Sequence, residues 1–193
     1  MAVIDSRSAD VLLPLESMGG GNPISLIRQY VSLCTGLGMK FVREAYIAAP
    51  GVQPSPETDW CAVNIDRIEF LGTPYQQGVR GDLAKPESGY AETIQHQILH
   101  CAASFYGPDA METACAFRDS FSLGHNLSWL ERKGLSGISI DETFQRLPDM
   151  FGNRWIDRYQ LGFRLGRAVT RKYGIRDIAG FSGVETYTEK GKI

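Results

Sequence analysis

The chain has 193 residues, a formal net charge of −2 and a hydrophobic share of 43%. These values are ordinary for a single globular domain with a sizeable core. The small net charge excludes a strong electrostatic attraction to nucleic acid or to an anionic membrane. No stretch approaches the roughly 18 consecutive apolar residues of a membrane span, and the N-terminus lacks the basic start and apolar core of a signal peptide.

The N-terminal region divides into an arm and a helix. Residues 1–21 end in the glycines Gly19–Gly21, and we expect them to form a flexible N-terminal arm. A helix follows, because Asn22 is a suitable N-cap, Pro23 suits the first helical position, and apolar residues then recur at helical spacing. Gly36 and Gly38 are expected to end this helix.

Two long strands are predicted in the first half of the chain, after a short strand within Lys40–Ala49. The runs Trp60–Leu71 and Tyr90–Tyr106 alternate apolar and polar residues, which is typical of strands. Between them, Thr73–Ser88 is polar and rich in glycine and proline. We expect a long, mobile hairpin loop there, and loops of that length in a compact domain are usually functional or disordered.

Two helices are predicted next. Gly107–Asp109 opens the first, with Pro108 at the first helical position and an acidic residue at the positive end of the helix dipole. A shorter helix is expected from Asn126, acting as its cap, to Lys133, with Trp129 packed inward. The chain therefore passes from its second long strand into a helical segment.

A pair of strands dominates the last third. In Gly137–Pro148 apolar and polar residues alternate, and Gly152 marks a reversal of the chain. In Arg154–Lys172 the alternation returns, and one set of alternate positions is largely apolar. A helix is the competing interpretation of the last run, but Gly162 and Gly166 in its interior favour a strand. A final strand is expected at Ile178–Thr188.

These elements predict an α+β fold: a mainly antiparallel β-sheet with long strands, flanked by helices on a face. We expect a flexible arm at 1–21, a single α+β domain at 22–176, and a C-terminal strand and tail at 177–193. The structural core is expected to include Trp129, Trp155 and Phe163. Truncating a large buried aromatic such as Trp155 would cost roughly 3 kcal/mol or more.

Residue types that could support catalysis are present but poorly spaced. His96 and His100 would lie roughly 13 Å apart on a strand, too far to share one metal ion. His125 precedes the expected cap Asn126, and no Gly-x-Ser-x-Gly motif is present. No catalytic residue, cofactor or metal is therefore expected. A small hydrolase or metal-binding enzyme using His96, His100 or His125 remains the alternative of another class.

The four cysteines have apolar neighbours and no Cys-x-x-Cys spacing, so we interpret them as buried free thiols in a reducing compartment. Basic residues concentrate on the last long strand. They could be a solvated face, contacts to a protein neighbour or, least favoured, contacts to DNA. They are Arg154, Arg158, Arg164, Arg167, Arg171 and Lys172.

Several short motifs resemble the neck or tail terminator proteins of contractile-tailed bacteriophages. The resemblance spans roughly Pro23 to Lys172. Its motifs are the helix Ile24–Leu37, Tyr106–Ala110, Phe117–Ser120, Asn126, Leu130, Gly134–Leu135, Leu147–Pro148 and the run that begins Arg154-Trp155 and continues through Arg158 to Leu161. The connection at Met39–Val52 departs from the family pattern, and Asp177–Ile193 has no evident counterpart.

The resemblance implies a non-enzymatic virion protein of the tail or neck, assembled in the host cytoplasm. Such subunits form a homo-oligomeric ring, commonly a hexamer, that caps the tail tube and sheath and joins them to the head connector or collar protein. Genomic DNA would pass through the lumen without specific binding, and no membrane partner is implied. A connector or stopper protein in an adjacent neck ring is the alternative within this class. Candidate subunit-interface residues are Arg118, Asp119, Arg154, Arg158 and Arg164.

Overall fold

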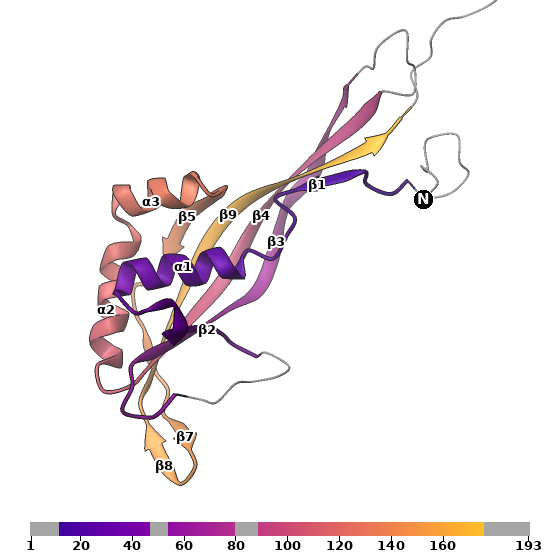
Figure 1. Ribbon diagram of the computed structural model, residues 1–193. Coiled ribbons are helices and arrows are strands. Elements are labelled where there is room, and N and C mark those ends of the chain that lie inside the picture. Colours follow the sequence, from indigo (N-terminus) through magenta and orange to yellow (C-terminus); the bar gives the residue numbers. More distant parts are fainter. Residues whose placement is uncertain (1–11, 47–53, 80–88, 176–193) are drawn as a thin grey trace, which may run out of the picture. The chain divides into compact units, whose positions relative to one another are not determined.

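The computed structural model describes residues 12–46, 54–79 and 89–175 and has an α+β fold (Figure 1). Its helices are α1 (Ile24–Thr35), α2 (Ala110–Phe121) and α3 (Gly124–Glu131), with one 3-10 turn at Met39–Phe41. Its strands are β1 (Glu16–Met18), β2 (Val42–Glu44), β3 (Trp60–Val79), β4 (Tyr90–Tyr106), β5 (Leu135–Ile140), β6 (Gln145–Arg146), β7 (Asp149–Phe151), β8 (Arg154–Ile156) and β9 (Arg158–Gly174). The described residues contain no helix long and apolar enough to cross a membrane.

The chain divides into two compact units. Unit 1 comprises Met1–Ser17, Tyr75–Ile94 and Thr170–Ile193, and unit 2 comprises Met18–Pro74 and Gln95–Val169. Strands β3, β4 and β9 each continue from one unit into the other. This division does not test the predicted single domain at 22–176, which stays a prediction.

Most of the sheet is antiparallel, with the strand order β1-β9-β4-β3-β2, and β5 and β6 also pair with β9. The pairings of β5 and β6 with β9 are antiparallel, while β2 runs parallel to β3. In unit 2, helices α1, α2 and α3 lie together on one face of the sheet (Figure 1). The other face of unit 2 carries no helix in the described residues. The predicted fold class is thereby confirmed.

The core of unit 2 lies between the helices and the sheet. Alternate residues of β9 are buried, with Phe163 2% exposed and both Leu161 and Leu165 fully packed. Phe117 on α2 meets the ring of Phe163 edge-on at 5.3 Å, and Phe121 meets the same ring at 5.8 Å. The aromatic residues of α2 therefore pack directly onto the apolar face of β9, which is formed by every second residue of the strand.

Helix α1 is fixed to this core by a buried hydrogen bond. The Tyr30 hydroxyl donates to the carbonyl of Phe121 at 2.8 Å, so the polar end of a fully buried ring is satisfied. The helix ends at Gly36, which has φ +75°. Asn22 does accept a hydrogen bond from the N–H of Ile24, but Pro23 is the cap rather than the first helical residue.

A second, smaller cluster packs elsewhere in unit 2. Trp60 and Tyr106 stack with ring centroids 4.2 Å apart. The chain then turns at Gly107, which has φ +111°, and a Cβ there would lie 2.7 Å from the backbone carbonyl oxygen of Thr58. The next turn is held by Asp59, whose carboxylate accepts a hydrogen bond from the N–H of Asp109. Glycine is therefore required at 107 on both conformational and steric grounds.

In unit 1, a backbone hydrogen bond and an ion pair join the start of the described chain to β9. The N–H of Leu15 donates to the carbonyl of Lys172 at 2.7 Å, and the Lys172 ammonium lies 3.1 Å from the Glu16 carboxylate. The same ammonium lies over the Tyr90 ring. Part of the N-terminal region expected to be a flexible arm is therefore a paired strand, which the sequence did not indicate.

Three predicted elements have different extents in the structure. Thr73–Val79 belongs to β3, so the prediction of a loop over all of Thr73–Ser88 is wrong for that half, while residues 80–88 lie outside the described residues. The second strand of the last third is interrupted at Asp157, and the first is split into β5 and β6. The predicted final strand at Ile178–Thr188 lies outside the described residues.

The helix starts and one core residue also need correction. Asp109 caps α2, which leaves Pro108 outside it, and Leu123 caps α3 in place of Asn126. Asn126 instead donates its side-chain amide to the carbonyl of Ser120. Trp155 is 67% exposed, so its predicted place in the core is wrong. It lies on β8, which in the described residues pairs with β7 in a separate two-stranded sheet, on the face opposite to the one by which Ile156 packs against Trp60 and Tyr106.

Candidate assembly surfaces

Strand β3 has a bare stretch in unit 2. Every residue from Asp66 to Pro74 is exposed, including Ile68 at 40% and Phe70 at 62%. On its outer side β3 pairs with β2 only at Cys61–Val63, so the edge beyond Val63 has no pairing strand among the described residues. An exposed apolar strand with a free edge is a typical site for association with another chain.

A polar cluster lies between β3 and β4 in the same unit. The His100 ring nitrogen Nε2 lies 2.8 Å from the Glu69 carboxylate, and the Arg67 guanidinium lies 3.8 Å from that carboxylate. The hydrogen bond with His100 and the nearby cationic charges lower the pKa of the Glu69 carboxyl below its usual 4.5. The cluster is exposed, so it contributes charge to the surface more than it stabilises the fold.

The three histidines considered for catalysis are spread over two elements. His96 is exposed on β4, His100 is bonded to Glu69, and His125 is exposed on α3. Among the residues that the structure describes, no group of three or more His, Cys, Asp or Glu side chains could hold a metal ion.

The cysteines are partly as expected. Cys61 and Cys101 are buried, while Cys34 and Cys115 are only half-buried, and all four are free. Burial raises the pKa of the Cys34 thiol to about 11 and that of Cys101 to about 12. Both thiols are thus almost entirely protonated at neutral pH, which makes them poor nucleophiles.

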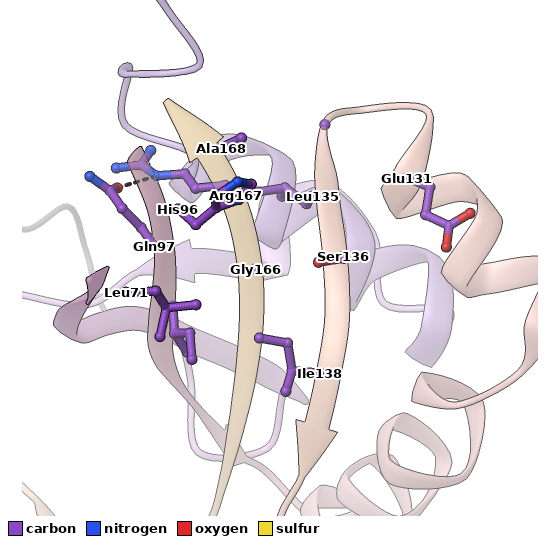
Figure 2. Close-up of a pocket in the computed structure, with 12 residues that line it drawn as sticks. Leu71, His96, Gln97, Glu131, Leu135, Ser136, Ile138, Gly166, Arg167 and Ala168 are labelled. Carbon is purple, nitrogen blue, oxygen red and sulfur yellow. Dashed lines mark hydrogen bonds between the residues drawn. The ribbon is translucent and has the colours of Figure 1, made fainter. Parts of the chain in front are cut away.

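The face of the unit 2 sheet away from the helices contains a shallow hollow of about 430 Å³. Figure 2 shows the side chains of Leu71 and Ile138 on either side of β9 at Gly166. Leu71 is 48% and Ile138 49% exposed, and Ile98 of β4 adds to the apolar lining. A Cβ at Gly166 would lie 2.5 Å from the Ser136 hydroxyl, so the glycine leaves the floor of the hollow open.

The hairpin formed by β7 and β8 carries a second apolar surface. Met150 and Trp155 are directly opposed across the two strands, and they are 54% and 67% exposed. Opposed residues of an antiparallel pair share a face, so the two side chains form one patch. The sequence predicted a buried Trp155 because tryptophan is usually buried, although Asp157 and the turn at Gly152 mark a break between this hairpin and β9.

The arginines proposed for an interface have different surroundings. Arg158 lies 3.3 Å from the Asp149 carboxylate and has a half-buried side chain, 27% exposed. Arg154 forms an exposed 2.8 Å ion pair with Glu57, and Arg164 is exposed on β9. Exposed pairs of this kind contribute at most about 1 kcal/mol to stability. Their roles at a subunit interface stay predictions.

The remaining candidates occupy helices or the core. Arg118 and Asp119 are neighbours on α2, with 3.3 Å between the guanidinium and the carboxylate, and both are exposed. Trp129 is half-buried and stacks on Tyr30 with ring centroids 6.0 Å apart. Phe163 lies in the main core. Arg118 and Asp119 pair with each other. Among the described ion pairs, neither residue contacts a residue of β9.

The exposed strand edge, the apolar hollow and the tryptophan hairpin are properties of a structural protein that associates with other chains. A family model described as phage neck terminator protein matches residues 24–191. The chain belongs to this family, and it is a structural component of a phage tail or neck. The comparison with curated proteins found no match.

The match confirms the resemblance and extends it. The motifs indicated a range from Pro23 to Lys172, and the family model continues to residue 191. The expectation that Asp177–Ile193 has no counterpart in the family is therefore wrong for most of that segment.

Proposed function

We propose that this chain forms a homohexameric ring at the head–tail junction of the virion. The ring caps the tail tube and sheath and joins them to the head connector, with the genomic DNA passing through its lumen. Subunits fold in the host cytoplasm and assemble there onto a completed tail. Family membership identifies the chain as a structural component of a phage tail or neck. The ring, its copy number and its partners are the proposal.

The observation that carries this proposal is the bare stretch of β3. Nine consecutive exposed residues, Asp66–Pro74, would be an aggregation hazard on a protein that remains a monomer. A subunit that is permanently covered by its neighbours can tolerate such a stretch. The charged residues Arg67 and Glu69 interrupt the apolar ones, which favours a defined partner over unspecific self-association.

The proposal is tested by native mass spectrometry of the purified chain and by cryo-electron microscopy of virions that carry an affinity tag on it. A six-copy ring, with tag density between tail and connector, is the expected result. Density in the ring next to the head would identify a connector or stopper protein instead. A chain that remains monomeric and is missing from virions would contradict the proposal.

A non-enzymatic role is part of the same proposal. We expect the triple replacement of His96, His100 and His125 by Gln to leave ring formation unchanged, and elemental analysis of the native protein to find no stoichiometric metal. Loss of assembly together with loss of a bound metal would favour the metal-binding alternative.

A further inference from the structure

We propose that, outside the ring, this chain forms a two-fold dimer in which the free β3 edges of two copies pair antiparallel, with Ile68 of one copy opposite Ile68 of the other. This inference goes beyond the proposed ring. Neighbours around a single axis meet head to tail, whereas a two-fold contact joins the same surface of both copies. The dimer covers the bare stretch Asp66–Pro74 before a subunit enters the ring, and so protects it from unspecific pairing.

The free part of the β3 edge has two defined ends. At one end, β2 pairs with β3 as far as Val63, whose carbonyl accepts a hydrogen bond from the N–H of Ala45 at 2.9 Å. At the other end, Gly72 has φ +62°, a left-handed conformation that interrupts the regular extension of a strand. Among the described residues, the free edge therefore runs over Asn64–Gly72, with Ile68 at its centre.

The extent of this edge selects the register. A free strand edge carries unpaired N–H and C=O groups, and an antiparallel partner strand satisfies them. When a second copy is related to the first by a two-fold axis at Ile68, the two free edges overlap over their whole length. A shift of the register in either direction shortens the overlap, because β2 occupies the edge up to Val63 and the regular strand is interrupted at Gly72.

The same register places opposite charges across from each other. With the axis at the centre of the edge, Arg67 of each copy lies directly opposite Glu69 of the other. Both side chains lie on one face of β3, because His100 Nε2 is 3.1 Å from Arg67 Nη2 and 2.8 Å from Glu69 Oε2. Directly opposed residues of an antiparallel pair share a face, so the register permits both ion pairs. Asp66 is opposed by Phe70, and no like charges face each other.

The surroundings of the two charges permit them to change partners. Within one chain the Arg67 guanidinium lies 3.8 Å from the Glu69 carboxylate, and the two side chains are 67% and 46% exposed. An exposed pair of this kind contributes little, so a pair between copies can replace it at small cost. His100 and Arg164 also help to lower the pKa of the Glu69 carboxyl, which keeps it ionised at neutral pH.

Cysteine cross-linking tests the register. Directly opposed residues have Cα atoms roughly 4.5–5.5 Å apart, within the range that a disulfide spans. Ile68→Cys should therefore give a covalent dimer under mild oxidation. Phe70→Cys is the matched control on the same edge: its two copies would lie roughly 13 Å apart along the strands and should not cross-link. The wild type, whose cysteines include the half-buried Cys34 and Cys115, controls for the native thiols.

Charge reversal tests the ion pairs. Arg67→Glu or Glu69→Arg alone turns both attractive pairs of the dimer into repulsive ones. Each variant should lower the affinity between copies by at least about 10-fold, measured by sedimentation velocity below the concentration at which rings form. The matched control is Arg118→Glu, which reverses an exposed arginine beside a carboxylate on α2. The control should dimerise like the wild type.

Mixing the two charge variants gives the sharpest result. In an equimolar mixture, each Arg67→Glu chain can oppose a Glu69→Arg chain, and both ion pairs are then restored with their signs exchanged. We expect a 1:1 heterodimer that is tighter than either homodimer. Pairing within one chain cannot produce this result, because each variant carries like charges at 67 and 69. A mixture that associates no more tightly than its components, with both folded by circular dichroism, overturns the inference. Failure of Ile68→Cys to cross-link more than Phe70→Cys also overturns it.

The dimer and the proposed ring can fail separately. If virions show the ring but the mixed variants do not associate, the ring stands and the two-fold contact is wrong. If the heterodimer forms and Ile68→Cys cross-links, while the tagged chain is missing from the neck of virions, the dimer stands and the proposed ring is wrong.

Discussion

Truncation of two aromatic residues of the last third of the chain, Phe163 and Trp155, should destabilise the protein to very different extents. Phe163 is 2% exposed, and its ring meets those of Phe117 and Phe121 edge-on. Removing a side chain of roughly 200 Å² at about 25 cal/mol per Å² costs up to about 5 kcal/mol. Measured truncations of buried Phe cost about 3–5 kcal/mol, so we expect Phe163→Ala to destabilise unit 2 by about 4 kcal/mol.

Trp155 gives the comparison. It is 67% exposed, so about a third of its side-chain area is covered. That third, roughly 70 Å², corresponds to at most about 1.7 kcal/mol for Trp155→Ala. This is well below the roughly 3 kcal/mol predicted from the sequence, because that figure assumed full burial.

Urea unfolding followed by circular dichroism measures both changes. All variants should be compared at one protein concentration, since assembly couples to unfolding. If Phe163→Ala does not fold, Phe163→Leu provides a milder step in the same direction. The reasoning is refuted if Trp155→Ala costs as much as Phe163→Ala, because the exposed hairpin would then be part of the core.

Further predictions concern the backbone, the polar cluster around Glu69 and the proposed interface. Gly107→Ala should destabilise the protein by about 2 kcal/mol or more, because φ +111° and a close carbonyl both exclude a Cβ, whereas Gly78→Ala, in open space, should be nearly neutral in thermal melts. The Glu69 pKa is lowered in the folded state, so its contribution to stability is present above the unfolded pKa and is lost as pH falls through the folded value. Carboxyl NMR titration should find this pKa below 4.5, moving upward in His100→Gln; an unchanged value would show that the hydrogen bond has no effect. Arg164→Glu should impair ring formation and leave the monomer folded, and normal rings in native mass spectrometry would exclude Arg164 from the interface.

The sequence determined much of the fold through local patterns. The alternation of apolar and polar residues in Tyr90–Tyr106, and in the run containing Leu161 and Leu165, predicted the two long strands and which face of each is buried. The turn residue Gly36 set the end of α1 correctly. These features depend on neighbours within a few positions, which is why residue type and spacing alone were sufficient.

Only the tertiary structure decided which surfaces remain uncovered. Trp155 and Phe163 are both aromatic and occupy equivalent positions of the alternating pattern, yet one lies on the outer face of the two-stranded β7–β8 hairpin and the other under α2. The bare stretch Asp66–Pro74 and the hollow beside Gly166 likewise depend on which strands and helices are adjacent in space. Burial is set by contacts between residues far apart in the chain, and a single sequence contains no direct record of those contacts.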